Sequence, residues 1–163
     1  MGYAFTTYSN EGLLRQLKNQ ATIDNPNISL TVDALWDTGA SGSCISRDVV
    51  EKMGLKPSGM LQVYTPTGKD TRYTYLVDVV LPNNVRIADL RVIESEIGAQ
   101  GIGLLVGMDI ISAGDFAVSN FNGRTCFTFR IPSEKQTDYV KESKLQQLMG
   151  PKHGKGTKKK RGK

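Results

Sequence analysis

The segment ALWDTGASGS, residues 34–43, places one aspartate, Asp37, between an apolar run and a run of very small residues. Gly39 lets the backbone turn tightly and approach a neighbouring segment without a Cβ in the way. Thr38 adds a hydroxyl that can fix the loop through a hydrogen bond. A carboxylate held in such a loop is suited to activating a water molecule for attack on a carbonyl group.

That chemistry requires a second carboxylate beside the first. Two carboxyl groups at close range cannot both ionise, so one remains an acid while the other serves as a base. Peptide hydrolysis uses both roles, because the water must lose a proton and the leaving amine must gain one. The sequence therefore raises the question of where the partner of Asp37 lies.

Two other aspartates lie one or two residues after a glycine, but neither is followed by a Thr-Gly turn. Asp109 in GMDI is expected to be structural, either capping the helix that follows or pairing with a basic residue. Asp115 in SAGDF is expected to be a turn residue. No internal repeat supplies a second loop like that of Asp37.

Nucleophilic catalysis by serine or cysteine has little support in the sequence. Ser41 and Ser43 lack an accompanying base, and the Gly-x-Ser-x-Gly elbow is absent. The one histidine, His153, lies in a tail rich in glycine and lysine. Cys44 and Cys126 are too few for a disulfide framework and too isolated for a zinc site, so we expect reduced thiols in a cytoplasmic protein.

Three segments, in this order, resemble the retropepsin-like aspartic proteases over about residues 28–130. ALWDTGASGSCIS resembles their active-site loop, whose signature is two apolar residues followed by Asp-Thr-Gly-Ala/Ser. LLVGMDII, residues 104–111, is similar to their second apolar-apolar-Gly segment, which wraps around the catalytic loop and leads into a helix. YTPTGKDTRY, residues 64–73, stands where that family carries its flap, a hairpin that closes over substrate.

The resemblance implies an all-β fold, a closed barrel with a short helix after the second motif. It implies an aspartic endopeptidase that needs no metal or cofactor. Members with one Asp-Thr-Gly loop per chain form homodimers, so the partner of Asp37 would be Asp37 of a second copy. The catalytic residues implied are Asp37, Thr38 and Gly39, and the peptide or protein substrate would contact Ala40, Ser41, Thr65, Thr67, Gly68 and Lys69.

The chain departs from the family pattern at a few positions in these motifs. Ser41 and Gly42 stand where viral enzymes usually carry acidic residues, and Met108 replaces an arginine that is common there. A serine at position 40 could donate a hydrogen bond to the catalytic carboxylate and favour its ionised form. Because Ala40 removes that donor, we expect a less acidic pH optimum than that of a pepsin.

The elements expected to position Asp37 are mostly short strands. Apolar and polar residues alternate from Ile28 to Trp36, which predicts a half-buried strand that runs directly into Asp37. A dimer-interface role is predicted for the strand Cys126–Ile131, together with the N-terminal strand. Other strands are predicted at 3–8, on both sides of TPTGKD, at 85–94, within 101–107 and in a hairpin around Asn122-Gly123; short helices are predicted within 9–19, 46–55 and 133–149, and a turn at 21–27.

Composition separates a body from a basic tail. The net charge is +5, but the last twelve residues, 152–163, hold seven Lys or Arg and no acidic residue, and the remainder has 14 basic and 16 acidic residues. The sequence contains no run of about 18 apolar residues, so it predicts no membrane-spanning helix. We expect an N-terminal strand and helix extension at 1–26, the protease-like domain at 27–132, a helical extension at 133–150 and a disordered basic tail at 151–163.

Two alternatives to an active protease remain open. The fold could serve as a non-catalytic dimeric binding or scaffold module that retains Asp37 without using it. The tail, residues 152–163, could instead be the main functional element and attach the protein weakly to nucleic acid or another polyanion.

Overall fold

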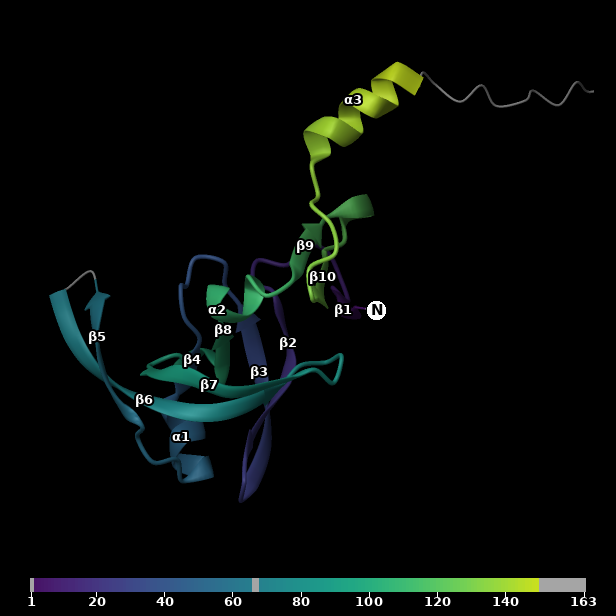
Figure 1. Ribbon diagram of the computed structural model, residues 1–163. Coiled ribbons are helices and arrows are strands. Elements are labelled where there is room, and N and C mark those ends of the chain that lie inside the picture. Colours follow the sequence, from purple (N-terminus) through teal and green to yellow (C-terminus); the bar gives the residue numbers. More distant parts are fainter. Residues whose placement is uncertain (1, 66–67, 150–163) are drawn as a thin grey trace, which may run out of the picture.

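The computed structural model describes residues 2–65 and 68–149, and the chain forms a closed barrel with a second, smaller sheet beside it (Figure 1). Six strands close the barrel in the order β2-β3-β8-β4-β7-β6, and β6 pairs back onto β2. The second sheet has the order β1-β10-β9. The strands are β1 (Tyr3–Tyr8), β2 (Lys18–Asn25), β3 (Ile28–Trp36), β4 (Cys44–Ser46), β5 (Gly59–Thr65), β6 (Gly68–Val80), β7 (Arg86–Ser95), β8 (Leu104–Val106), β9 (Asp115–Ser119) and β10 (Cys126–Ile131).

The helices are short and lie outside the barrel wall. α1 (Arg47–Met53) lies within the predicted range 46–55. Its N-cap is Ser46, whose side chain accepts a hydrogen bond from the Val49 backbone N–H, and its C-cap is Gly54 in the left-handed conformation. α2 (Met108–Ile111) follows β8, also as predicted. α3 (Tyr139–Met149) begins later than the predicted helix and stands away from the barrel (Figure 1). Short 3₁₀ turns cover Gly98–Gln100 and Phe121–Gly123.

The predicted helix within residues 9–19 and the predicted turn at 21–27 are both wrong. Residues 9–17 form a loop in which Gly12 has φ of 61° and Ser9 donates a hydrogen bond to its carbonyl. β2 then runs to Asn25, burying Ala21 and Ile23, and makes a hairpin with β3. The turn is confined to residues 26–27.

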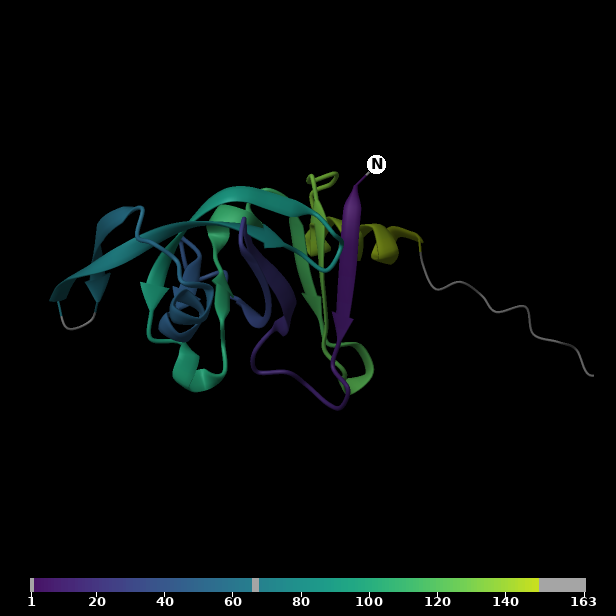
Figure 2. The same ribbon diagram turned by 90° about the horizontal axis from the view of Figure 1, so that it is seen from below.

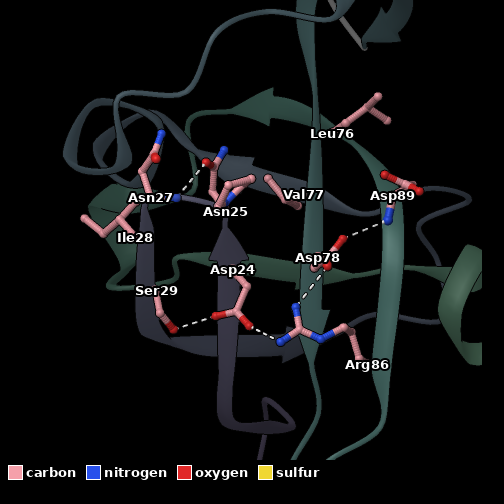
Figure 3. Close-up of a pocket in the computed structure, with 11 residues that line it drawn as sticks. Asp24, Asn25, Asn27, Ile28, Ser29, Leu76, Val77, Asp78, Arg86 and Asp89 are labelled. Carbon is pink, nitrogen blue, oxygen red and sulfur yellow. Dashed lines mark hydrogen bonds and ion pairs between the residues drawn. The ribbon is translucent and has the colours of Figure 1, made fainter.

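The seam where β6 closes onto β2 brings two carboxylates together. Asp24 is directly opposite Asp78 in the register of this antiparallel pair. Arg86 on β7 bridges them, donating to Asp24 Oδ2 at 2.5 Å and to Asp78 Oδ2 at 2.9 Å (Figure 3). A depression of about 630 Å³ lies over this seam, and Arg86 there is paired with both Asp24 and Asp78, so these three residues have a structural role.

The second sheet buries an aromatic cluster against the end of β3. Trp36 stacks on Phe116 with ring centroids 5.4 Å apart, and Phe5, Phe127 and Phe129 surround the pair. Phe127 and Phe129, two residues apart on β10, are fully buried in this cluster. β10 lies between β1 and β9, so both of its edges are occupied and its backbone offers no open edge to a second copy.

Within the described residues, no helix has the length and apolar character needed to cross a membrane. Two predicted features, the contact residue Thr67 and the basic tail at 152–163, lie outside the described residues.

Candidate active site

β3 ends at Trp36, and Asp37 is the first residue of the loop that follows this strand (Figure 1). Trp36 pairs with Val106 of β8, and the Asp37 backbone N–H donates to the Val106 carbonyl at 3.0 Å. The Asp37 side chain is half-exposed, and its Oδ1 accepts a hydrogen bond from the Gly39 N–H at 2.8 Å. The backbone therefore fixes the position and the direction of this carboxylate.

The segment after β8 wraps around the Asp37 loop. The Met108 N–H donates to the Ala40 carbonyl at 2.8 Å. A Cβ on Gly107 would lie 2.6 Å from the backbone carbon of Gly42, so a side chain at position 107 would collide with the loop. Gly107 thus allows the two segments to pack backbone against backbone.

Asp109 holds the two segments together from the side. Its carboxylate accepts from the Ser43 N–H at 2.8 Å and from Ser43 Oγ at 2.7 Å. Ser43 Oγ in turn accepts from the Gly107 N–H at 3.1 Å, and Ser43 is fully buried. Asp109 is structural, as predicted, but its partner is Ser43 and α2 begins at Gly107 without a side-chain cap.

Sequence reasoning considered Ser43 only as a nucleophile and missed its role as a structural hydroxyl. The signal that could have identified it is its position among very small residues in the loop. A polar side chain there has little room except against the segment that wraps around the loop. Its alternative role as a nucleophile has no support, because Ser43 Oγ already donates to Asp109 and accepts from Gly107.

Cys44 follows Ser43 in the chain, and its surroundings disfavour the reactive thiolate form. Burial raises the pKa of the Cys44 thiol, and the nearby carboxylates of Asp109 and Asp37 raise it further. The thiolate is the nucleophilic form of cysteine, so this environment disfavours cysteine catalysis.

Asp115 is also structural. It begins β9, and its carboxylate accepts hydrogen bonds from Arg130 and Ser133. The pKa of Asp115 is lowered, chiefly because its carboxylate also accepts a hydrogen bond from the Glu134 N–H.

Two open depressions flank Asp37. The first is lined by the loop and α2: Thr38, Gly39, Ala40, Ser41, Met108, Asp109 and Ser112. The second includes Asp37 itself: Arg15, Gln16, Leu17, Leu35, Trp36, Asp37, Thr38, Phe116 and Val118. The structure therefore brings the predicted residues of the loop, from Asp37 to Ser41, together on one surface.

The predicted flap residues belong to a separate element. β5 and β6 form a hairpin in which Tyr64 pairs with Lys69 and Thr65 pairs with Gly68. The Lys69 ammonium lies 5.5 Å from the centre of the Tyr64 ring. None of the described residues of this hairpin lines either depression beside Asp37, and Figure 1 shows the hairpin standing to one side of the loop.

Comparison with known proteins agrees with this arrangement. The sequence profile of the family described as aspartyl protease matches residues 20–110. No curated protein matches the chain by sequence. The crystal structure of a retropepsin-like aspartic protease from Rickettsia conorii is similar at 16% identity and a TM-score of 0.51, covering 80% of this chain and 96% of that one.

A second similar structure is the retroviral protease-like domain of Ddi1 from Leishmania major, at 20% identity and a TM-score of 0.46. It covers 77% of this chain and 98% of that one. The profile match spans more than half of the chain and includes β3, the Asp37 loop and β8. The chain therefore belongs to the aspartyl protease family and has the retropepsin-like fold.

Proposed function

We propose that this protein is an aspartic endopeptidase that acts as a homodimer, with the Asp37 carboxylates of two copies forming one catalytic pair. The observation that carries this proposal is the rigid, half-exposed Asp37 carboxylate in a chain of this family that has a single Asp-Thr-Gly loop. A single carboxylate cannot serve as acid and base at once, so a second copy must supply the other.

In the proposed reaction the two Asp37 side chains share one proton. The ionised carboxylate takes a proton from a water molecule, which attacks the carbonyl carbon of the scissile peptide bond. The protonated carboxyl donates its proton to the carbonyl oxygen. When the carbon–nitrogen bond breaks, the carboxyl that took the water proton gives a proton to the leaving amine. The other carboxylate takes a proton back from a hydroxyl of the tetrahedral intermediate, which leaves a carboxylic acid product and restores the shared proton.

The residues proposed to hold the substrate flank this pair. Ala40 and Ser41 lie in the depression beside α2, where an extended peptide could run along the loop. We propose that Thr65, Thr67, Gly68 and Lys69 of the hairpin also contact the peptide once it is bound. We place the activity in the cytoplasm, because both Cys44 and Cys126 are free thiols.

The test is replacement of Asp37 by Asn, which keeps the shape of the side chain and removes the base. We expect cleavage of a peptide library to fall by about 10³-fold or more while Tm stays close to that of the wild type. Asp33→Asn is the matched control, since Asp33 is an exposed carboxylate on the same strand. Equal cleavage by Asp37→Asn and wild type would contradict the proposal.

A further inference from the structure

The loop before β2 places one arginine, Arg15, beside the candidate active site. The Leu14 N–H donates a hydrogen bond at 2.8 Å to Oγ1 of Thr125, a residue that is 1% exposed. Two residues beyond Arg15, the Leu17 carbonyl accepts a hydrogen bond from the Trp36 N–H at 2.9 Å. The backbone on both sides of Arg15 is therefore tied to the barrel and the second sheet, and Figure 2 shows this loop beside the β9–β10 connection.

Arg15 lines the same depression as Asp37, and its guanidinium is free to meet a bound molecule. The side chain is exposed and forms no ion pair with any residue that the structure describes. Its planar fork of N–H donors matches the geometry of a carboxylate, and the amide of the neighbouring Gln16 can donate another hydrogen bond. The depression also has apolar lining residues: Leu17, Leu35, Trp36, Phe116 and Val118.

The charges around Asp37 leave the selection of substrate charge to Arg15. Within the described residues, the charged side chains that line the two flanking depressions are Arg15, Asp37 and Asp109. Asp109 already accepts two hydrogen bonds from Ser43, and Asp37 is assigned to the reaction. An acidic side chain of a peptide in this depression would be attracted to Arg15, and a basic one would be repelled.

We infer that Arg15 selects peptide substrates that carry a glutamate or aspartate close to the scissile bond. The inference rests on the proposed function, because a peptide that is cleaved at Asp37 must lie against the depression that Arg15 lines. The substrate carboxylate accepts hydrogen bonds from the guanidinium, while the methylene groups of a glutamate pack on the apolar lining residues. Since Arg15 is exposed, water screens this ion pair, and we expect a preference of about fivefold.

The test measures kcat/KM of the full chain for pairs of peptides that differ only by Glu or Gln at one position, which is moved stepwise along both sides of the scissile bond. For the wild type we expect the Glu peptide to be cleaved about fivefold better at one of these positions, and the ratio to shrink as salt is added. Arg15→Gln should bring this ratio to about one, and Arg15→Glu should favour a Lys peptide over the Glu peptide. Arg91→Gln is the matched control and should keep the wild-type ratio, because Arg91 is exposed and lines neither depression.

A binding measurement separates this inference from the proposed function. Fluorescence anisotropy of the labelled Glu and Gln peptides gives their dissociation constants for the wild type, Asp37→Asn and Arg15→Gln. Tighter binding of the Glu peptide that Arg15→Gln abolishes, without any cleavage by the wild type, would support the role of Arg15 and contradict the protease proposal.

Three results would overturn the role of Arg15. Cleavage with a Glu-to-Gln ratio that is the same in wild type and Arg15→Gln would do so and leave the protease proposal standing. An Arg15→Gln variant that raises the dimer dissociation constant and keeps this ratio would assign Arg15 to the contact between copies instead. A wild type that neither cleaves nor binds any of the peptides would overturn both proposals.

Discussion

Single residues decide how firmly the Asp37 loop is held. Ser43 is fully buried and depends on the Asp109 carboxylate for both its N–H and its hydroxyl. A buried donor that loses its acceptor costs about 1–3 kcal/mol. The carboxylate of Asp109 therefore supports the Asp37 loop, and we propose no catalytic role for it.

Asp109→Ala should lower the free energy of unfolding by about 1–3 kcal/mol, because it leaves the buried Ser43 N–H without its acceptor. Asp109→Asn should be intermediate, since it retains one acceptor oxygen. Chemical denaturation measures the free energy of unfolding of both variants. The kcat for a peptide substrate should fall more for Asp109→Ala than for Asp109→Asn. An Asp109→Ala variant with wild-type stability would show that the network does not support the loop.

At the scale of elements, the Glu94 carboxylate joins the hairpin to the rest of the barrel. Tyr75 on β6 donates to Glu94 Oε2 at 2.8 Å, and Arg47 at the start of α1 donates to Oε1 at 3.1 Å. The neighbouring Ile93 N–H donates to the Ser43 carbonyl at 3.1 Å. β7 thus ties the base of the hairpin to the segment that follows the Asp37 loop.

This connection predicts a dependence of stability on alkaline pH. Burial, and then the hydrogen bond to Glu94, raise the pKa of Tyr75 from 10.0 to about 12. Because the folded pKa is the higher one, the stabilisation is complete below pH 10.0 and is lost as the pH rises through about 12. Tyr75→Phe should flatten the fall of Tm over this range, while Tyr73→Phe, at a half-exposed ring, should not. Parallel curves for Tyr75→Phe and wild type would refute this.

The barrel seam predicts a dependence on acid. The Ser29 hydroxyl and Arg86 lower the pKa of Asp24, and the Asp89 N–H and Arg86 lower that of Asp78. Both folded pKa values lie below the ordinary 3.8, so this stabilisation is present above pH 3.8 and is lost as the pH falls through the folded values.

Arg86→Met should lower Tm at neutral pH, because it leaves the directly opposed carboxylates of Asp24 and Asp78 facing each other. Arg91→Met on the same strand is the control, as Arg91 is exposed and makes no ion pair with another described residue. Equal Tm values for Arg86→Met and Arg91→Met would contradict this prediction, because they would show that water screens the Asp24 and Asp78 carboxylates well enough without Arg86.

Sequence patterns predicted the elements whose stability is local. β3 follows strict alternation, α1 has a Ser cap and a closing glycine, and the β9–β10 turn contains Asn122-Gly123. These signals depend on neighbours in the chain and can be read without the fold. The packing of the LLVGMDII segment around the Asp37 loop was anticipated from the resemblance to the retropepsin-like proteases and from no local pattern.

The errors lie where distant residues decide the structure. Residues 9–17 form a loop because Thr125, more than a hundred residues away, accepts the Leu14 N–H that a helix would use. β2 extends through a segment rich in Asn and Asp because β3 and β6 pair with both of its sides. Ser43 and Glu94 gain their roles from partners on other strands, which no local pattern specifies.

For the whole molecule, the separation of charge between body and tail makes a prediction. Residues 152–163 hold seven of the 21 basic residues. Their deletion should weaken binding to a single-stranded RNA and reduce the steepness of its salt dependence, since fewer counterions are released. Peptide cleavage and Tm should be unchanged. An equal affinity and salt slope for the truncated and full chains would rule out a polyanion-binding role for the tail.

The pairing of β1 with β10, which places Tyr3 opposite Ile131, also orders events during synthesis. A ribosome releases the first strand long before the strand that must join it. Until residue 131 has emerged, the aromatic cover over Trp36 is incomplete, and so is the support of Asp37. On the proposed function, a chain that has not yet been synthesised through residue 131 lacks this packing behind Asp37 and should not cleave peptides.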